Sequence, residues 1–273
     1  MSQLTDRPAL DRQRARAARN PALFLQESAA DDIQDRLIEV KRSFTAPAVV
    51  TPWPDLWAER LPGARIVADA EVLDLTEGAH DLVIHALCLH WADDPLGQII
   101  QCARALKPDG LFIAAFFGGE TLAPLRAALA EAELAVTGGV SPRVLPMAEV
   151  RQAGALLQRA GLALPVADLT PLDVSWPGAL ALMRDLRAMG EGNALAQRLR
   201  RPTRREVIAR AAARLEEGAD AEGRITARFE MITLTGWAPA EGQQQPMRPG
   251  TASHRLEDVL RAAREAAPGT DGD

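Results

Sequence analysis

The sequence predicts an α/β fold with a doubly wound, mostly parallel sheet. Two apolar runs within 79–117 are joined by about three turns of helix, which indicates a βαβ unit with parallel strands covered on both faces. Apolar residues within 24–40 recur at helical spacing, whereas those within 223–237 alternate with polar residues as in a half-buried strand. Ligands of such sheets lie beyond the carboxyl ends of the strands, so 86–91 and 118–121 mark the rim of a candidate site.

The elements follow in order from these spacings and from the positions of proline. The helix over 24–40 is expected to pack on a first strand at 47–51, and a further strand covers 64–68. After the βαβ unit we predict helices over 120–133 and 148–160, one or two strands over 163–176 broken by Pro165 and Pro171, helices over 177–189 and 203–217, and a strand of about a dozen residues within 223–237.

Composition excludes several classes of protein. The net charge of −6 argues against a basic face that binds nucleic-acid phosphates. Two cysteines on apolar segments, Cys88 and Cys102, indicate buried thiols and not a disulfide framework. No run approaches the roughly 20 apolar residues of a membrane span, and Met1 to Leu10 lacks the apolar core of a secretory signal. We therefore expect a cytoplasmic protein.

Several segments together resemble one enzyme family. They are the Asp-Leu-Val strand at 81–83, the Lys-Pro-Asp-Gly turn at 107–110, and the segments 117–126, 138–143, 185–191 and 235–237. The chain resembles class I S-adenosylmethionine-dependent methyltransferases. Two branches are most similar, namely the malonyl-carrier-protein methyltransferases of biotin synthesis and the methyltransferase-like assembly factors of respiratory complex I. The second branch, which includes an arginine hydroxylase, matches better.

The resemblance implies a domain organisation. Residues 1–45 form N-terminal helices that pack on the sheet, and 46–238 form a Rossmann-like methyltransferase domain with an antiparallel last strand. Insertions at 118–147 and 177–217 form a helical lid. The end of the chain, 239–273, is rich in glutamine and proline and is expected to be a disordered tail.

The glycine turn that holds the cofactor in this family is missing here. The resemblance implies a glycine-rich turn after the first strand and an acidic residue at the end of the second strand for the ribose hydroxyls. Here 47–51 runs into Pro52-Trp53-Pro54, and no glycine occurs between Asp6 and Leu61. Because proline fixes φ and lacks an N–H, we expect weak binding of S-adenosylmethionine. The strand at 64–68 is similar to the family's third strand, so the sheet is expected to be shortened near strand 2.

Six residues at strand ends are the predicted cofactor contacts: Thr51, Asp69, Ala70, His85, Ala86 and Leu87. Asp69 follows a strand, where its carboxylate is suited to accept hydrogen bonds from the adenine amine or the ribose. The alternative is a solvated loop acid. The resemblance places His85 against the adenosyl group, and the alternative is a histidine whose hydrogen bonds are satisfied inside the protein.

Six further residues are predicted on the substrate side: His90, Trp91, Glu120, Thr121, Arg126 and Arg143. Trp91 is expected to form a wall of the pocket. Free N–H groups at a helix start near Thr121 are expected to bind an anion. By resemblance, Arg126 corresponds to an arginine of a substrate-carboxylate site. Each of the three charged residues also has a structural alternative. Glu120 would be a negative charge that complements the dipole at a helix N-terminus, Arg126 would form a surface ion pair, and Arg143 would bridge lid helices.

The sequence leaves three functions open. It contains no zinc spacing and no phosphate loop, and His85 and His90 would point to opposite faces of a strand, so we predict no metal site. No catalytic base is identified, and methyl transfer would depend on the alignment of donor and acceptor. The first function is methyl transfer to a protein or a small acidic substrate. The others are non-catalytic assembly of complex I and hydroxylation of a protein arginine, with a complex I subunit or another protein as partner.

Overall fold

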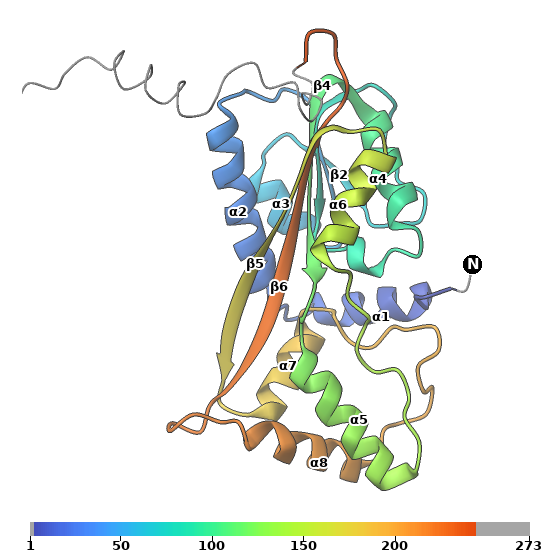
Figure 1. Cartoon of the computed structure of the whole chain (residues 1–273), viewed down its shortest axis with the longest axis vertical. Coiled ribbons are helices and arrows are strands. Elements are labelled where there is room, and N and C mark those ends of the chain that lie inside the picture. The colour runs from blue at the N-terminus through green and yellow to red at the C-terminus, as the bar shows by residue number, and fades with distance from the viewer. Residues whose placement is uncertain (1–2, 244–273) are drawn as a thin grey trace, which may run out of the picture. The chain divides into compact units, whose positions relative to one another are not determined.

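The structure is a computed structural model that describes residues 3–243. Two compact units divide the chain, Met1–Glu241 and Gly242–Asp273, and the architecture below is that of the first unit. Its described part contains a six-stranded sheet with helices on both faces and a helical lid at one end (Figure 1). The strands are β1 (Pro47–Thr51), β2 (Arg65–Ala68), β3 (His80–Ala86), β4 (Leu106–Gly118), β5 (Ala163–Trp176) and β6 (Ile225–Trp237). The helices are α1 (Arg7–Ala17), α2 (Phe24–Val40), α3 (Pro54–Arg60), α4 (Pro95–Ala105), α5 (Ala123–Thr137), α6 (Val150–Arg159), α7 (Ala179–Ala188) and α8 (Arg205–Glu216), with a 3-10 turn at Leu89–Trp91.

Four neighbouring strands form the parallel half of the sheet, whose full order is β2-β1-β3-β4-β6-β5. β1 lies between β2 and β3, so that Val49 has Ile66 on one side and Ile84 on the other. β3 and β4 are parallel, with Ile84 beside Ile113, and α4 connects them. The predicted βαβ unit is therefore confirmed, and the α/β fold with a mostly parallel sheet is correct.

The short strand β2 differs from the prediction in its place. It pairs directly with β1, with Val50 beside Val67. It therefore has the position of the family's second strand and not that of the third strand, to which its sequence was compared. Within residues 3–243 it is also the edge of the sheet. The expected shortening near strand 2 is therefore a four-residue edge strand with no other strand beyond it in the part described. As a result, Asp69 follows the strand next to β1.

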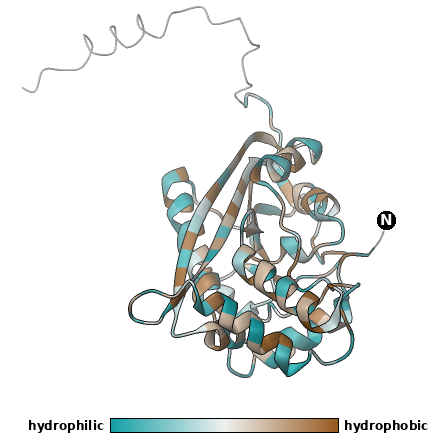
Figure 2. Cartoon of the chain, turned by 60° about the horizontal axis from the view of Figure 1, so that its bottom comes forward, coloured by the Kyte–Doolittle hydropathy of each residue, from teal (hydrophilic) through white to brown (hydrophobic). Residues whose placement is uncertain are grey.

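The other half of the sheet is antiparallel. β6 pairs antiparallel with β4 on one side and with β5 on the other, which confirms the predicted last strand. β5 is one strand of 14 residues that continues through Pro171, and the expected break is limited to an irregularity in its pairing with β6 between Ala163 and Val166, where Pro165 lies. An edge strand tolerates proline because one side of its backbone needs no partner for an N–H group. Figure 2 shows hydrophobic and hydrophilic residues alternating along these long strands.

Helices cover the two faces of the sheet with separate apolar cores (Figure 1). α2 has the bounds that its spacing predicted, and it buries Leu25, Ala29 and Ile33 against one face. On the other face, α4 and α6 bury residues such as Ile99 and Leu157. Each large side chain among these contributes about 1.5–3 kcal/mol through its burial. Two covered faces explain why the central strands are apolar throughout.

The lid lies beyond the carboxyl ends of the parallel strands (Figure 1). It contains α5, α7 and α8, and α5 begins three residues later than predicted, at Ala123. Pro177 precedes the cap residue Gly178 and therefore lies outside α7. α1 runs between the sheet and the lid, where Leu10 is fully buried. Most of the predicted tail, from 244 onward, lies outside the described residues. None of the helices in 3–243 has the length and apolar character needed to cross a membrane.

Candidate functional site

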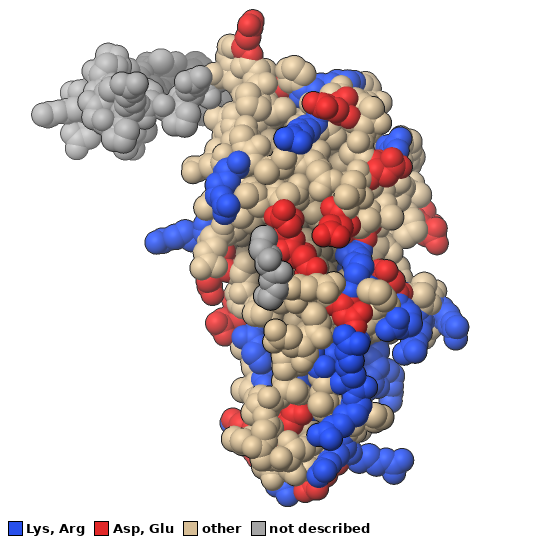
Figure 3. Space-filling model, turned by 90° about the vertical axis from the view of Figure 1, so that its right-hand side faces the viewer, with Lys and Arg blue, Asp and Glu red and all other residues tan. Residues whose placement is uncertain are grey.

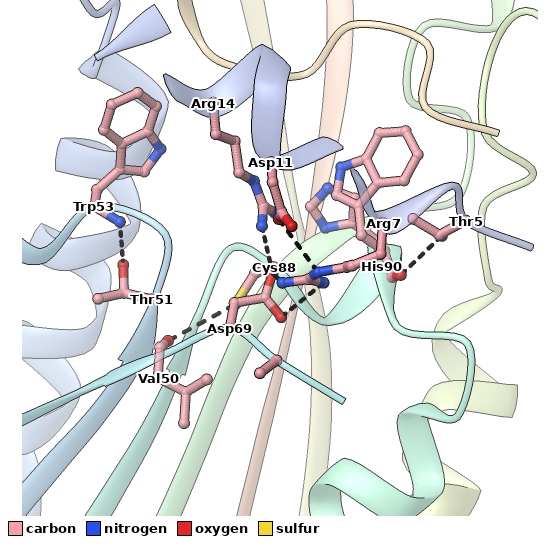
Figure 4. A network of polar contacts seen from close by, with 12 residues as sticks. Thr5, Arg7, Asp11, Arg14, Val50, Thr51, Trp53, Asp69, Cys88 and His90 are labelled. Atoms are coloured by element: carbon pink, nitrogen blue, oxygen red, sulfur yellow. Dashed lines mark hydrogen bonds and ion pairs between the residues drawn. The ribbon is translucent and has the colours of Figure 1, made fainter. Parts of the chain in front are cut away.

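Three strand ends meet the side chains of α1 at the carboxyl edge of the sheet (Figure 4). β1 ends at Thr51, β2 leads into Asp69, and β3 contains His85 near its end. Because these strands are parallel neighbours, the predicted cofactor contacts do come together. They are also buried, since Thr51, Asp69 and His85 are 2%, 7% and 0% exposed.

Asp69 forms a buried ion pair with two arginines of α1 (Figure 4). The nitrogen Nη1 of Arg14 lies 2.5 Å from the oxygen Oδ2, and Nη2 of Arg7 lies 3.1 Å from the same oxygen. Burial raises the pKa of the Asp69 carboxyl, but the charges of Arg14 and Arg7 outweigh it and hold that pKa below its ordinary value. Asp69 is therefore an ionised group whose partners belong to the chain itself.

The turn after β1 is closed by its own side chains. The hydroxyl Oγ1 of Thr51 accepts the N–H of Trp53 at 3.0 Å. Pro52 and Pro54, on either side of Trp53, have no N–H to offer. The Trp53 side chain is buried, and a Cβ on Gly190 would lie 3.6 Å from its ring and 3.0 Å from Cγ of Arg14. The Trp53 and Arg14 side chains thus both pack against the turn at Gly190.

His85 has partners for both of its ring nitrogens. Nε2 lies 2.8 Å from Oε1 of Gln98, and Nδ1 lies 3.4 Å from Sγ of Cys88. Burial lowers the pKa of His85 despite the nearby charge of Asp69, so the ring is neutral at pH 7. Gln98 also donates its amide to the carbonyl of Ala70 at 3.0 Å. The geometry matches a core histidine that links β3 to α4.

The backbone after β3 is also closed. Ala86 and Leu87 are completely buried, and the N–H of Leu87 donates to the carbonyl of Ala115 at 2.8 Å. Leu87 adopts a left-handed conformation with φ of 47°, which ends the strand and turns the chain toward the 3-10 turn. All six predicted cofactor contacts are therefore engaged with, or packed against, the protein itself.

A separate cavity of about 270 Å³ lies inside the lid. Its walls are mainly apolar and include the aromatic side chains of Trp91, Phe117 and Phe229. Its polar lining consists of His90, Thr121, Arg143, Arg187, Glu191, Asn193 and Thr203. The structure thus places four of the predicted substrate-side residues around this cavity, namely His90, Trp91, Thr121 and Arg143. Glu120 and Arg126 are not among its lining residues.

Glu191 is the one carboxylate among the described residues that line this cavity. It follows Gly190, whose φ of +79° makes the left-handed turn that ends the α7 segment. The oxygen Oε2 of Glu191 accepts the indole N–H of Trp91 at 2.6 Å and lies 3.1 Å from Nε2 of His90. Burial raises the pKa of Glu191, but the charge and hydrogen bond of His90 outweigh it, with help from Arg14. The net shift is downward, so the carboxylate is ionised.

His90 links Glu191 to the aromatic wall. Its ring centroid lies 5.2 Å from that of Phe117, in a tilted arrangement that aromatic pairs favour. The other ring nitrogen, Nδ1, is buried and has no hydrogen-bond partner within the described residues. His90 therefore joins a carboxylate on one side to an apolar surface on the other.

Arg143 holds the lid together from beside the cavity. It donates to both oxygens of Glu133 on α5, from Nη2 at 2.6 Å and from Nε at 2.9 Å. Its third donor, Nη1, binds the hydroxyl of Thr203 at 2.9 Å. The hydrogen bond from Arg143 lowers the pKa of Glu133 to about 2. This geometry corresponds to the alternative in which Arg143 bridges parts of the lid.

The start of α5 differs from the predicted anion site. The N–H groups of Thr121, Leu122 and Ala123 donate to carbonyl groups of the protein, and that of Glu120 donates to the Glu230 carboxylate. These donors are therefore not free for an anion. Arg126 is half-buried, its Nη2 lies 3.5 Å from the Thr121 carbonyl, and it forms no ion pair within residues 3–243.

No metal site appears in the described range 3–243, where no three His, Cys, Asp or Glu side chains are arranged to hold an ion. Cys88 and Cys102 are both fully buried, and burial raises the pKa of each thiol. Both cysteines are therefore inert core thiols.

Comparisons with known proteins agree with the fold. The family described as a methyltransferase domain matches residues 40–114. The arginine-hydroxylase NDUFAF5 of Danio rerio is 36% identical over 204 residues, which are 75% of this chain and 64% of that protein. The malonyl-[acyl-carrier protein] O-methyltransferase of Xylella fastidiosa is 33% identical over 178 residues, which are 65% of this chain and 58% of that protein. The chain is thus similar to class I S-adenosylmethionine-dependent methyltransferases and methyltransferase-like proteins over most of its length.

The extent of these matches limits what the similarity to methyltransferases says about this chain. It spans about three fifths of the length of the vertebrate relatives it matches. Among solved structures, the YcgJ protein of Bacillus subtilis is 11% identical, with a TM-score of 0.48, and the match covers 76% of this chain and 97% of that one.

The residues at the strand ends do not fit the cofactor of this methyltransferase family in the arrangement described. The ribose would need a carboxylate with free oxygens, but Arg7 contacts both Asp69 oxygens and Arg14 contacts one of them. The methionine portion would need open backbone after β1, where Trp53 is buried and its N–H is already bonded. We therefore assign no catalytic step to S-adenosylmethionine.

Sequence reasoning missed the two residues that decide this point, Arg7 and Arg14. A signal was present, because Arg7, Leu10, Arg14 and Ala17 recur at spacings of three and four and thus share one helix face. Glu191 belongs to segment 185–191, which contributes to the family resemblance, but its role as a cavity carboxylate was not predicted. The glycine before it was the available signal for a turn.

Proposed function

We propose that this methyltransferase-like protein binds an arginine side chain of a partner protein in the lid cavity, as part of the assembly of a complex I-type respiratory enzyme. The observation that carries the proposal is the ionised Glu191 carboxylate in a cavity whose walls are otherwise mainly apolar and aromatic. An ionised group so placed attracts a cationic ligand, because charge pairing offsets the loss of water on binding.

An arginine side chain has the shape and chemistry that this cavity requires. Its three methylene groups suit the apolar walls, and its planar guanidinium pairs well with a carboxylate and stacks on aromatic rings. The volume of about 270 Å³ is just below the range of about 300–1,000 Å³ that is usual for small-molecule pockets. One side chain therefore suits it better than a whole nucleoside cofactor.

The cations beside the cavity do not oppose this assignment. Arg143 lines the cavity, but Glu133 neutralises it through two hydrogen bonds. Arg187 also lines the cavity, and it is exposed, so water screens its charge. The remaining ionisable groups at the wall are Glu191 and its partner His90.

The relatives support the choice of arginine. NDUFAF5 proteins from Danio rerio, Rattus norvegicus and Homo sapiens, at 36–37% identity, are named arginine-hydroxylases. The segments that link this chain to the complex I assembly branch include 185–191, which supplies Leu186, Arg187 and Glu191 to the cavity. The part of the chain that resembles that branch thus builds the site proposed here.

Methyl transfer is the second candidate, and the similarity to methyltransferases favours it. It requires the methyl donor to displace Arg7 and Arg14 from Asp69 and Trp53 from the end of β1. Losing a few hydrogen bonds worth about 1 kcal/mol each weakens binding by orders of magnitude. We therefore infer that S-adenosylmethionine binds in the millimolar range or more weakly.

Calorimetric titration of the full chain tests both candidates. The probes are Nα-acetyl-arginine methylamide, its neutral citrulline analogue and S-adenosylmethionine. We expect binding of the arginine compound only, and we expect Glu191→Gln to weaken it at least about 30-fold because one partner of a buried charge pair is lost. Glu131→Gln, an exposed acid of the lid with its own partner Arg214, is the matched control and should change nothing.

Two results would refute the proposal. Equal binding of the citrulline compound would show that the Glu191 charge does not select the ligand. A low-micromolar dissociation constant for S-adenosylmethionine would show that the cofactor site opens, and methyl transfer would then be preferred. In a deletion strain, Glu191→Gln is expected to leave the activity of the NADH:quinone oxidoreductase low, whereas Glu131→Gln restores it.

A further inference from the structure

Exposed arginines gather on the lid beside the cavity. Within 198–205 the chain contains five arginines in eight residues, although the protein as a whole has a net charge of −6. Figure 3 shows Lys and Arg side chains concentrated over the lid half of one face. We use the name basic lid surface for five exposed residues, Arg187, Arg200, Arg201, Arg204 and Arg205.

The basic lid surface borders the cavity directly. Arg187 is itself a lining residue, and Thr203, which lies between Arg201 and Arg204, is another. The hydrogen bond from Arg143 to Thr203 fixes this stretch against the lid. Positive charges therefore lie beside a cavity that the proposed function assigns to a partner side chain.

Most of these charges have no partner among the residues that the structure describes. Within residues 3–243, only Arg200 of the five forms an ion pair, at 3.6 Å from Asp6. Arg204 and Arg205 stand at the start of α8, where the helix dipole is positive and acidic residues are usual. Arginines at this end oppose the dipole, so their placement lowers the stability of the helix and points to a use outside the fold.

We propose that the basic lid surface binds an acidic surface of the partner protein and so brings the arginine of that partner to the cavity. The identity of the partner in this inference rests on the proposed function. The positive charge of the surface is a feature of the structure itself. Opposite charges around a binding site speed association and orient the partner, and they contribute less to the final affinity.

A protein surface fits these observations better than a lipid or a nucleic acid. No large exposed apolar side chain lies between 187 and 205, so the surface lacks the residues that insert into a membrane. The same stretch contains no aromatic residue on which a base would stack. The cavity beside it accepts a protruding side chain, which a flat membrane surface does not provide.

Fluorescence anisotropy with a labelled peptide tests the proposal. The probe is a peptide with one central arginine flanked on each side by a short run of glutamates, and its ends are acetylated and amidated. The companion peptide has glutamine in place of the central arginine. We expect both to bind the full chain, with affinity that falls as the NaCl concentration rises. The triple variant Arg201→Glu, Arg204→Glu, Arg205→Glu is expected to bind both at least about tenfold more weakly.

A matched triple variant controls for net charge. Arg104→Glu, Arg151→Glu, Arg159→Glu changes three exposed arginines on α4 and α6, which form no ion pair within the described residues. It should bind both peptides like the wild type. Thermal unfolding of both variants verifies that each is folded before binding is compared.

The outcomes separate this inference from the proposed function. Equal weakening by the two triple variants, or absence of binding to either peptide, overturns the basic lid surface. Tighter binding to phosphatidylglycerol vesicles or to a single-stranded RNA than to the peptide also overturns it. If the glutamine peptide binds as well as the arginine peptide, and the lid variant weakens both, the surface is supported and the arginine assignment fails.

Discussion

The replacement Asp69→Asn tests whether α1 closes the cofactor edge of the sheet. The asparagine would keep the size of the side chain but remove the charge that offsets Arg14. The Asp69 and Arg14 side chains are 1% and 10% exposed, and two nitrogens of Arg14 already lack a partner in the described residues. Removing one member of a buried ion pair costs about 3–5 kcal/mol, because the other charge is left uncompensated. For a domain of this size that corresponds to a fall in Tm of about 6–20 °C.

Thermal unfolding followed by circular dichroism at pH 7 measures this effect. The matched control is Asp173→Asn, which breaks an ion pair with Arg228 whose side chains are both about half exposed. Exposed pairs contribute about 1 kcal/mol or less, so the control should change Tm by about 4 °C at most. The double variant Asp69→Asn, Arg14→Leu removes both charges and should recover much of the lost stability.

Two results would refute the reasoning. If Asp69→Asn has the Tm of the control variant, the carboxylate is not paired with Arg14 in solution, and the cofactor edge is open. If the double variant is less stable than Asp69→Asn alone, Arg14 has another essential partner. Either result would remove the argument that the cofactor edge is sealed.

Two further predictions concern ionisable groups away from the strand ends. The pKa of Glu133 is lowered to about 2 by its hydrogen bond from Arg143, against about 4.3 in the unfolded chain, so its contribution to stability is complete above about pH 4.3 and is lost as the pH falls through 2. The free energy of unfolding of Glu133→Gln should therefore not show this fall between about pH 4 and 2. If its dependence on pH were parallel to that of the wild type, the pairing of Glu133 with Arg143 would be contradicted. Cys88 and Cys102 are buried with raised pKa values, so dithionitrobenzoate should not react with the folded protein at about pH 8 and should titrate two thiols in guanidinium chloride. Rapid reaction of one thiol before unfolding would show that its segment opens.

The sequence predicted most of the sheet because its signals were local. The bounds of β1 and α2 follow from runs of apolar residues at regular spacing, and the turn at 107–110 marks the entry to the buried part of β4. The position of a strand among its neighbours in the sheet is not determined by its own sequence. Nothing within 65–68 indicates which strand lies beside it, and β5 runs through two prolines because it is at an edge.

The candidate site was harder to predict because its contacts join distant segments. Arg14 and Asp69 are 55 residues apart in sequence, and Trp91 and Glu191 are 100 residues apart. The motif residues were found, but their partners decide their roles. Asp69 has the position of a cofactor ligand and the contacts of a structural ion, and only the placement of α1 distinguishes the two.

Arg14 couples the cofactor edge of the sheet, at Asp69, to the lid cavity, at Glu191. Burial lowers the pKa of its guanidinium, but the charges of Asp69 and Glu191 outweigh burial, so Arg14 remains a cation near both carboxylates. The backbone at Gly190, just before Glu191, packs against the Arg14 side chain, and a Cβ there would lie 3.0 Å from it. A ligand that drew Arg14 away from Asp69 would therefore also change the charge beside Glu191 and the packing of the turn that positions it. Conversely, a guanidinium bound to Glu191 would repel Arg14 toward Asp69. Occupation of the lid cavity by a cation and opening of the cofactor edge thus oppose each other, which favours one of the two proposed activities at a time.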